Sequence, residues 1–220
     1  MASYKNNFFS VKTELDVFTH KLINNSIEYG QTVQISPLNS LDSQKIIDFR
    51  IIGCDDYIDM SQTKIYCKVK IVESGNKNIL PSDTVAPCNN FLNSMFSHIN
   101  IELNSKSITT PNNCYHYRTY LETLLNYGEE SKKTHLVSEL FVKDEKNKFN
   151  SINSNGFVAR KALMNSDGAV ELIGYLHNDL CNQEKFLPSK IDVNFKFYRN
   201  DDNFSLMKSP EDKKNYEVMI

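Results

Sequence analysis

The sequence predicts an all-β protein: an antiparallel sandwich or barrel with short helices in the connections between strands. Apolar and polar residues alternate with period two along most of the 220 residues, which is the pattern of strands buried on one face. Seven or eight such segments are separated by turn residues, as in sandwiches and barrels. The 13 Phe and 11 Tyr supply enough large side chains to close one core. The length suits a single β-rich domain.

Two segments show the clearest alternation, Lys64–Glu73 and Ile191–Phe197. In both, every second residue is apolar and its neighbours are mostly polar or charged, so the apolar set shares one face of a pleated strand. We therefore expect eight side chains to point into the core: Ile65, Cys67, Val69, Ile71, Ile191, Val193, Phe195 and Phe197.

Weaker alternation predicts further strands, with turns between them. The strand segments are Ile27–Ile35, Ile46–Ile52, Ile99–Leu103, Phe157–Ala162 and Val170–Tyr175. The turn signals are Ser74–Asn76, Asn104–Ser105, Asn155–Gly156 and Asp167–Gly168, whose residue types favour tight turns. Residues Asn215–Ile220 look like the opening of a further strand that stops without a partner.

Two segments with helical spacing interrupt the strands. Pro111–Asn113 can begin a helix and Gly128 can end it, and the apolar residues between them recur at i, i+3, i+4, i+7 and i+8: Tyr117, Tyr120, Leu121, Leu124 and Leu125. A shorter helix is expected over Asn90–Phe96. The polar segment 144–155 is expected to be an exposed loop. The predicted organisation is an N-terminal arm (1–25), a β-rich domain (26–208) and the start of a connection or strand (209–220).

Charge and composition exclude several classes of protein. The formal net charge of −2 does not fit a chain that is basic throughout, so nucleic acid is not its obvious partner. No run approaches the roughly 20 apolar residues of a membrane-spanning helix, and the N-terminus has no secretion signal, which favours a cytosolic or nuclear protein. The five cysteines, Cys54, Cys67, Cys88, Cys114 and Cys181, are expected to be reduced and mostly buried.

The strongest catalytic candidates are two pairs of residues spaced two apart, Cys114 with His116 and His177 with Asp179. A nucleophile needs a base that a third group orients, and a metal needs three or four ligands, but no further partner can be named for either pair. The seven glycines form no phosphate-binding motif. The sequence therefore predicts no enzyme, cofactor, metal site or small-molecule substrate.

Two further clusters also favour structural roles. The acidic residues Asp55, Asp56 and Asp59 lack the spacing of a calcium loop, so a solvated turn is expected. Four tyrosines could stack on nucleic-acid bases, but only Arg118 supplies positive charge nearby, which favours packing instead. These tyrosines are Tyr115, Tyr117, Tyr120 and Tyr127.

Several segments resemble the major capsid (hexon) proteins of Polinton/Maverick elements and adintoviruses. They are Leu15–Thr19, Asp56–Met60, the long and most specific block Val85–Gly128, Gly174–Leu180 and Phe186–Pro188, in that order between about residues 15 and 207. The sequence departs from the family's pattern at Asn93, where the family usually has His, and near Cys181, where it usually has an aromatic residue.

The resemblance implies a double jelly-roll capsid protein, three copies of which form a capsomer. This chain resembles the N-terminal jelly roll, so residues 26–208 are expected to form a jelly-roll domain, an antiparallel eight-stranded jelly-roll sandwich. It leaves open whether the chain is a fragment or a free-standing single jelly roll. It also implies self-association, contacts with other capsid proteins, and a place in the virion after synthesis in the host cytoplasm or nucleus. The 220-residue form is expected to assemble weakly.

A sugar-binding or cupin-like enzymatic module on the same scaffold is the alternative, since the jelly roll hosts several functions. A cupin needs His and Glu clustered on neighbouring strands. The five histidines are scattered along the chain instead: His20, His98, His116, His135 and His177.

Overall fold

The computed structural model describes residues 27–41, 44–164 and 169–220. The chain divides into two compact units, Met1–Gln34 and Ile35–Ile220. Residues 27–34, the described part of the first unit, contain neither strand nor helix and are mostly exposed. The predicted strand Ile27–Ile35 is therefore wrong. Alternation stabilises a strand only where another strand offers hydrogen bonds and an apolar face, and the described residues offer none here.

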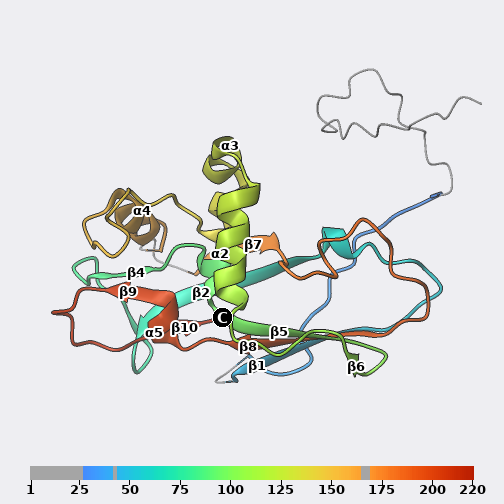
Figure 1. Cartoon of the computed structure of the whole chain (residues 1–220). Helices are drawn as coiled ribbons and strands as arrows, with labels where there is room; N and C mark the ends of the chain where they lie inside the picture. Colours follow the sequence, from blue (N-terminus) through green and yellow to red (C-terminus); the bar gives the residue numbers. More distant parts are fainter. Residues whose placement is uncertain (1–26, 42–43, 165–168) are drawn as a thin grey trace, which may run out of the picture. The chain divides into compact units, whose positions relative to one another are not determined.

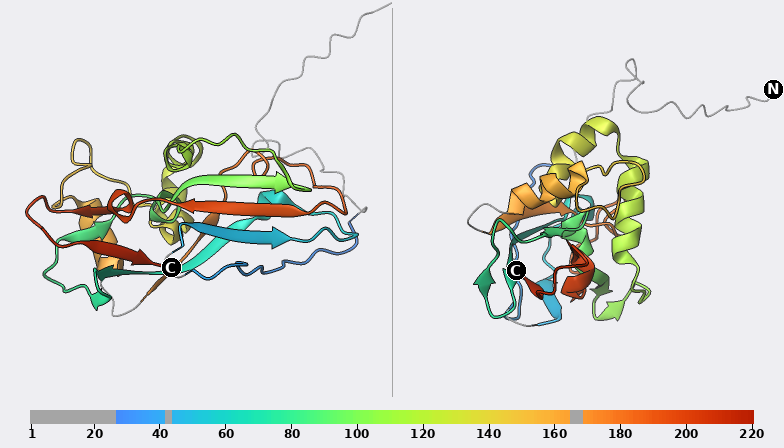
Figure 2. Two further views of the ribbon diagram at one scale, coloured as in Figure 1. Left: turned by 90° about the horizontal axis from the view of Figure 1, so that it is seen from below. Right: turned by 90° about the vertical axis from the view of Figure 1, so that its left-hand side faces the viewer.

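The second unit is β-rich and contains two four-stranded antiparallel sheets and one two-stranded sheet (Figures 1 and 2). The first sheet has the order β1-β8-β5-β6, from the strands Ile46–Ile51, Val193–Arg199, Phe96–Leu103 and Lys106–Ser107. Strand β1 pairs with β8 from Ile46 opposite Tyr198 to Ile51 opposite Val193. The predicted strands at 46–52, 99–103 and 191–197 are thus confirmed, with shifted ends.

The second sheet is built around the ten-residue strand β2, Lys64–Glu73, as predicted. Strand β2 pairs with β7 (Val170–Tyr175) over its first six residues. Its last residues pair with β10 (Tyr216–Met219) on one side and with β3 (Lys77–Asn78). The predicted terminal strand therefore exists, and β2 is its partner. A two-stranded ladder joins β4 (Val85–Pro87) to β9 (Leu206–Lys208).

One hydrophobic core joins the two sheets. Seven of the eight predicted core side chains are buried, and Ile191 packs against the core while partly exposed. The Phe197 ring makes edge contacts with Phe49 and Phe96, at centroid distances of 5.4 and 5.1 Å. A β-rich fold with two sheets around one core follows from these contacts.

Helices occupy the connections, as expected. They are α1 (Phe91–Ser94), α2 (Tyr115–Asn126), α3 (Glu129–Lys133), α4 (Asn155–Met164), α5 (Asp202–Ser205), and the 3₁₀ helices η2 (Met60–Gln62) and η3 (His135–Glu139). In Figure 1, α2 runs across the strands and α3 follows at its end.

Helix α4 replaces the predicted strand Phe157–Ala162 and the predicted turn Asn155–Gly156, both of which are wrong. The residues buried on α4 include Phe157, Arg160 and Met164, whose spacing fits one helix face rather than a strand face. The other predicted turn in this region, Asp167–Gly168, lies outside the described residues.

A fully buried arginine anchors α4. The Arg160 guanidinium lies 2.9 Å from Oδ1 of Asp144, whose side chain is also almost fully buried. It also donates hydrogen bonds to the carbonyl oxygens of Pro87 (3.0 Å) and Val142 (3.3 Å). The buried cation thus has both a countercharge and hydrogen-bond acceptors, as a charge in a core requires.

Candidate functional site

The first predicted catalytic pair does not form a reactive site. Cys114 is exposed at the start of α2. His116 is buried, its ring contacts Tyr117 and Phe204 at centroid distances of 4.1 and 4.3 Å, and burial lowers its pKa, which favours the neutral imidazole. Within the described residues no hydrogen bond joins Cys114 to His116.

The second pair is separated as well, and each member binds α2. Nδ1 of His177 lies 2.8 Å from Oε2 of Glu122, and Oδ1 of Asp179 accepts a 2.6 Å hydrogen bond from Arg118. Arg118 also donates to Oε1 of Glu122 at 2.6 Å, so it links the two contacts. Sequence reasoning missed this network, although Arg and Glu four residues apart on a helix are a recognisable pair. The network fastens α2 to the segment after β7.

The remaining candidate clusters have structural partners. Asp59 caps η2 through a 3.0 Å hydrogen bond from the Ser61 amide, and Asp55 pairs with Lys190 at 3.4 Å. Across residues 27–41, 44–164 and 169–220, no three His, Cys, Asp or Glu side chains are grouped to hold a metal.

The cysteines only partly follow the expectation. Cys67 and Cys181 are buried, and burial raises the pKa of both thiols to about 12, so they stay protonated. Cys88 is half-buried, whereas Cys54 and Cys114 are exposed. The described chain forms no helix long and apolar enough to cross a membrane.

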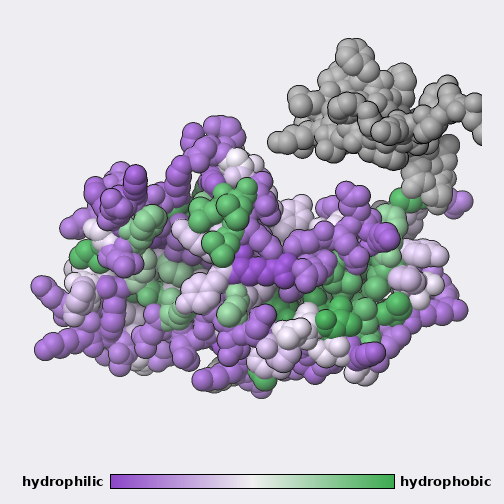
Figure 3. All heavy atoms as spheres, viewed as in Figure 1, coloured by the Kyte–Doolittle hydropathy of each residue, from purple (hydrophilic) through white to green (hydrophobic). Residues whose placement is uncertain are grey.

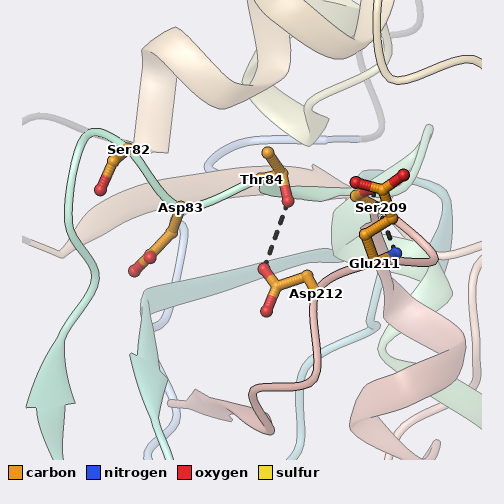
Figure 4. A pocket seen from close by; sticks show the side chains of 6 residues that line it. All are labelled: Ser82, Asp83, Thr84, Ser209, Glu211 and Asp212. Carbon is orange, nitrogen blue, oxygen red and sulfur yellow. Dashed lines mark hydrogen bonds between the residues drawn. The ribbon is translucent and has the colours of Figure 1, made fainter.

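A shallow depression lies between the turn before β4 and the turn after β9 (Figure 4). Its lining residues are Ser82, Asp83, Thr84, Ser209, Glu211 and Asp212. Two of the three carboxylates already have partners: Lys214 lies 2.9 Å from Asp83, and Asp212 accepts a 2.8 Å hydrogen bond from Tyr216. These contacts tie the two turns together and leave a poor set of ligands for a bound molecule.

Helix α2 is packed with its polar face inward, the reverse of an ordinary amphipathic helix. Its buried residues are Tyr115, His116, Thr119 and Thr123. The Tyr115 hydroxyl donates to Oδ1 of Asn93 at 3.0 Å, and Thr119 accepts a 3.3 Å hydrogen bond from Nδ2 of Asn90. Asn90 directly precedes α1 and Asn93 lies within it, so side-chain hydrogen bonds hold α2 against α1. We call these contacts the polar seat of α2.

Glu139 extends this polar seat to the edge of the second sheet. Its carboxylate is buried, accepts a 3.0 Å hydrogen bond from Asn93 and accepts another from the backbone N–H of Tyr175 in β7. Burial raises the pKa of Glu139 to about 7, although both hydrogen bonds favour the charged form. The carboxylate thus joins α1, η3 and β7 beneath α2.

The apolar residues of α2 face outward. We call Tyr117, Leu121, Leu124 and Leu125 the α2 apolar surface; all four are exposed, Leu125 to 81%. Tyr120 and Tyr127 are only partly exposed, and Tyr115 is buried, so the predicted packing of the tyrosines is confirmed for Tyr115. Figure 3 shows apolar residues gathered over α2. The ring centroid of Phe204 lies 6.0 Å from that of Tyr117, so Phe204 extends this surface toward α5.

Comparison with known proteins shows that the chain is similar to uncharacterized protein F54H12.2 of Caenorhabditis elegans, with 23% identity over 155 residues. The match covers 67% of this chain and 36% of the nematode protein, so the chain spans about a third of its relative. No protein-family model matches the chain.

Proposed function

We propose that this chain is a structural capsid protein of the hexon type, with a jelly-roll fold, that self-associates into capsomers and shells. The resemblance to Polinton and adintovirus capsid proteins motivates the proposal. Under it, the partners are further copies of the chain and other capsid proteins, and the protein is located in the virion.

The strand pairing supports the jelly-roll part of the proposal. Strands β1 and β2 follow one another in the chain but belong to different sheets, as do β7 and β8. Strand β1 pairs with β8, and β2 pairs with β7. Along the chain the β2–β7 pair is therefore nested inside the β1–β8 pair, and the two pairs belong to different sheets. Such winding is characteristic of jelly rolls and distinguishes them from simple meanders.

The α2 apolar surface is the observation that carries the self-association part. A helix normally buries its apolar stripe, because exposed hydrocarbon costs free energy. Here hydrogen bonds with α1 and the contacts of Arg118 with Asp179 and of Glu122 with His177 hold the polar face of α2 inward, so the stripe is available to a partner. The surface carries no formal charge that would select an oppositely charged partner. A second copy of the chain fits these requirements.

The described histidines give no comparable support to a cupin-like enzyme. The rings of His98, His116 and His135 contact Tyr198, Phe204 and Tyr127, respectively, while His177 contacts Glu122. A cupin would need several of them around one metal.

Analytical ultracentrifugation of the wild-type chain tests the proposal. We expect the average mass to rise with concentration, and Leu125→Glu to weaken association at least about tenfold, as for a central interface residue. Leu80→Glu is the matched control, because Leu80 is also an exposed leucine but belongs to the connection between β3 and β4 and not to α2. A wild-type chain that stays monomeric at high concentration would contradict self-association.

A further inference from the structure

We infer that Glu139 is a pH-sensitive latch beneath α2: its carboxyl group holds the α1–α2 layer on the sheet when protonated and loosens that layer when ionised. This inference concerns the seat of α2 and does not depend on whether the chain forms capsids.

The latch rests first on position. Glu139 ends η3, and its side chain contacts two other elements: Asn93 of α1 and the Tyr175 amide of β7. Asn93 in turn accepts the hydrogen bond from Tyr115 of α2. One carboxyl group therefore lies at the junction of four elements, and a change in its charge acts on all of them.

The second argument is the absence of a countercharge. None of the described Lys or Arg side chains forms an ion pair with Glu139. Two other buried carboxylates have a cation: Asp144 is neutralised by Arg160 at 2.9 Å and Asp83 by Lys214 at 2.9 Å. A buried carboxylate without a cation is costly in its charged form, whereas a paired one is less so. Glu139 therefore differs from both in how its charge affects stability.

The groups that face Glu139 reinforce this difference. Tyr115 of α2 and Tyr127 at the end of α2 are both influenced by its charge, which raises the pKa of each phenol in addition to burial. The ring of His135 in η3 contacts the ring of Tyr127, with 5.7 Å between the two centroids. Glu122, the nearest acid on α2, is held by Arg118 and His177. No basic group among these neighbours offsets the Glu139 charge.

The direction of the effect follows from linkage. In the folded state the pKa of Glu139 lies near 7, against an ordinary value of 4.5. The folded state therefore binds more protons than the unfolded state between these values. The stabilisation that protonated Glu139 gives the folded state is fully present below pH 4.5 and is lost as the pH rises through 7. Between pH 6 and pH 8, the fraction of molecules in which the α1–α2 layer is detached from the sheet should increase about tenfold.

Hydrogen exchange tests the latch at a concentration where the protein is monomeric. Exchange in α1, α2 and η3 should be about tenfold faster at pH 8 than at pH 6, after normalisation to Glu139→Gln at each pH. Glu130→Gln is the matched control, because Glu130 is a largely exposed acid on α3 and its substitution should leave the ratio unchanged.

Two results would overturn the latch. One is equal acceleration in β1 and β8, which would mean that Glu139 acts on the whole domain. The other is a carboxyl NMR titration of wild-type Glu139 with a midpoint near 4.5, a measurement that needs no variant. Because neither readout involves association, a failed latch is distinguishable from a failed capsid proposal.

Discussion

Glu139 and Gly174 lie so close together that the glycine has no room for a side chain. A Cβ placed on Gly174 would be 2.5 Å from both Cδ and Oε1 of Glu139. Gly174 is on β7, directly before Tyr175, whose amide donates to the same carboxylate. The glycine thus lets a buried acid reach the edge of the sheet.

Gly174→Ala should push the Glu139 carboxylate away from the Tyr175 amide. We expect the free energy of unfolding to fall by about 1–3 kcal/mol, because the core is overpacked at this point. Urea denaturation followed by circular dichroism measures the change. In the double variant with Glu139→Ala, most of the loss caused by the alanine at 174 should disappear, and a fully additive double variant would show that the two residues do not compete for space.

Arg160→Met should be among the most damaging substitutions in the chain. It leaves Asp144 as a buried charge without a partner and removes the donors to Pro87 and Val142. We expect a loss of about 3–5 kcal/mol in denaturant titrations. Adding Asp144→Asn should recover part of that loss; a double variant as unstable as the sum of the single variants would contradict the coupling.

Phe195→Ala tests the core face of β8. Phe195 is buried and lies close to Phe197, so its truncation should cost about 3–5 kcal/mol of unfolding free energy. Phe186→Ala is the control, because that ring is exposed and its removal should cost less than about 1 kcal/mol. Equal losses for the two variants would show that the assigned face is wrong.

Thr119→Val probes the polar seat of α2 without changing its shape. Removing the hydroxyl leaves Nδ2 of Asn90 buried with no acceptor at that position, and we expect a loss of about 1–3 kcal/mol. Thr123→Val is a matched comparison, because the Thr123 hydroxyl bonds only to the Thr119 carbonyl within its own helix. Thermal unfolding should show the larger decrease for position 119; the reverse order would argue against the asparagine contact.

The sequence predicted the strands better than the orientation of the helices. In β2 and β8 the buried residues alternate with polar ones, so both the strand and its inner face could be predicted. The strand predicted from Phe157 and Val158 onward was wrong, because a short apolar segment fits either a strand or one turn of helix. The helix α2 was predicted in the right place, but its apolar stripe faces outward. Asn90 donates a hydrogen bond to Thr119 and Asn93 accepts one from Tyr115, and only a polar helix face can make these contacts.

The site residues were harder to predict than the fold. His177 and Asp179 were singled out as a pair, yet each has its partner on α2, more than 50 residues away in the chain. Glu139 gave no signal at all, since a glutamate is ordinarily exposed. Its burial depends on the space at Gly174, which only the three-dimensional arrangement shows.

The nested pairing of β1 with β8 also sets the order in which the protein can fold. About 140 residues separate Ile51 from its partner Val193, so β1 leaves the ribosome long before its neighbour exists. At synthesis rates of about 5–20 residues per second, Ile47 and Phe49 wait on the order of 10 s or more without the strand that covers them. Loop closure over such a distance is slow. The nascent chain therefore exposes the apolar side chains of its first strand until its last strands emerge, and this is the interval in which aggregation competes with folding.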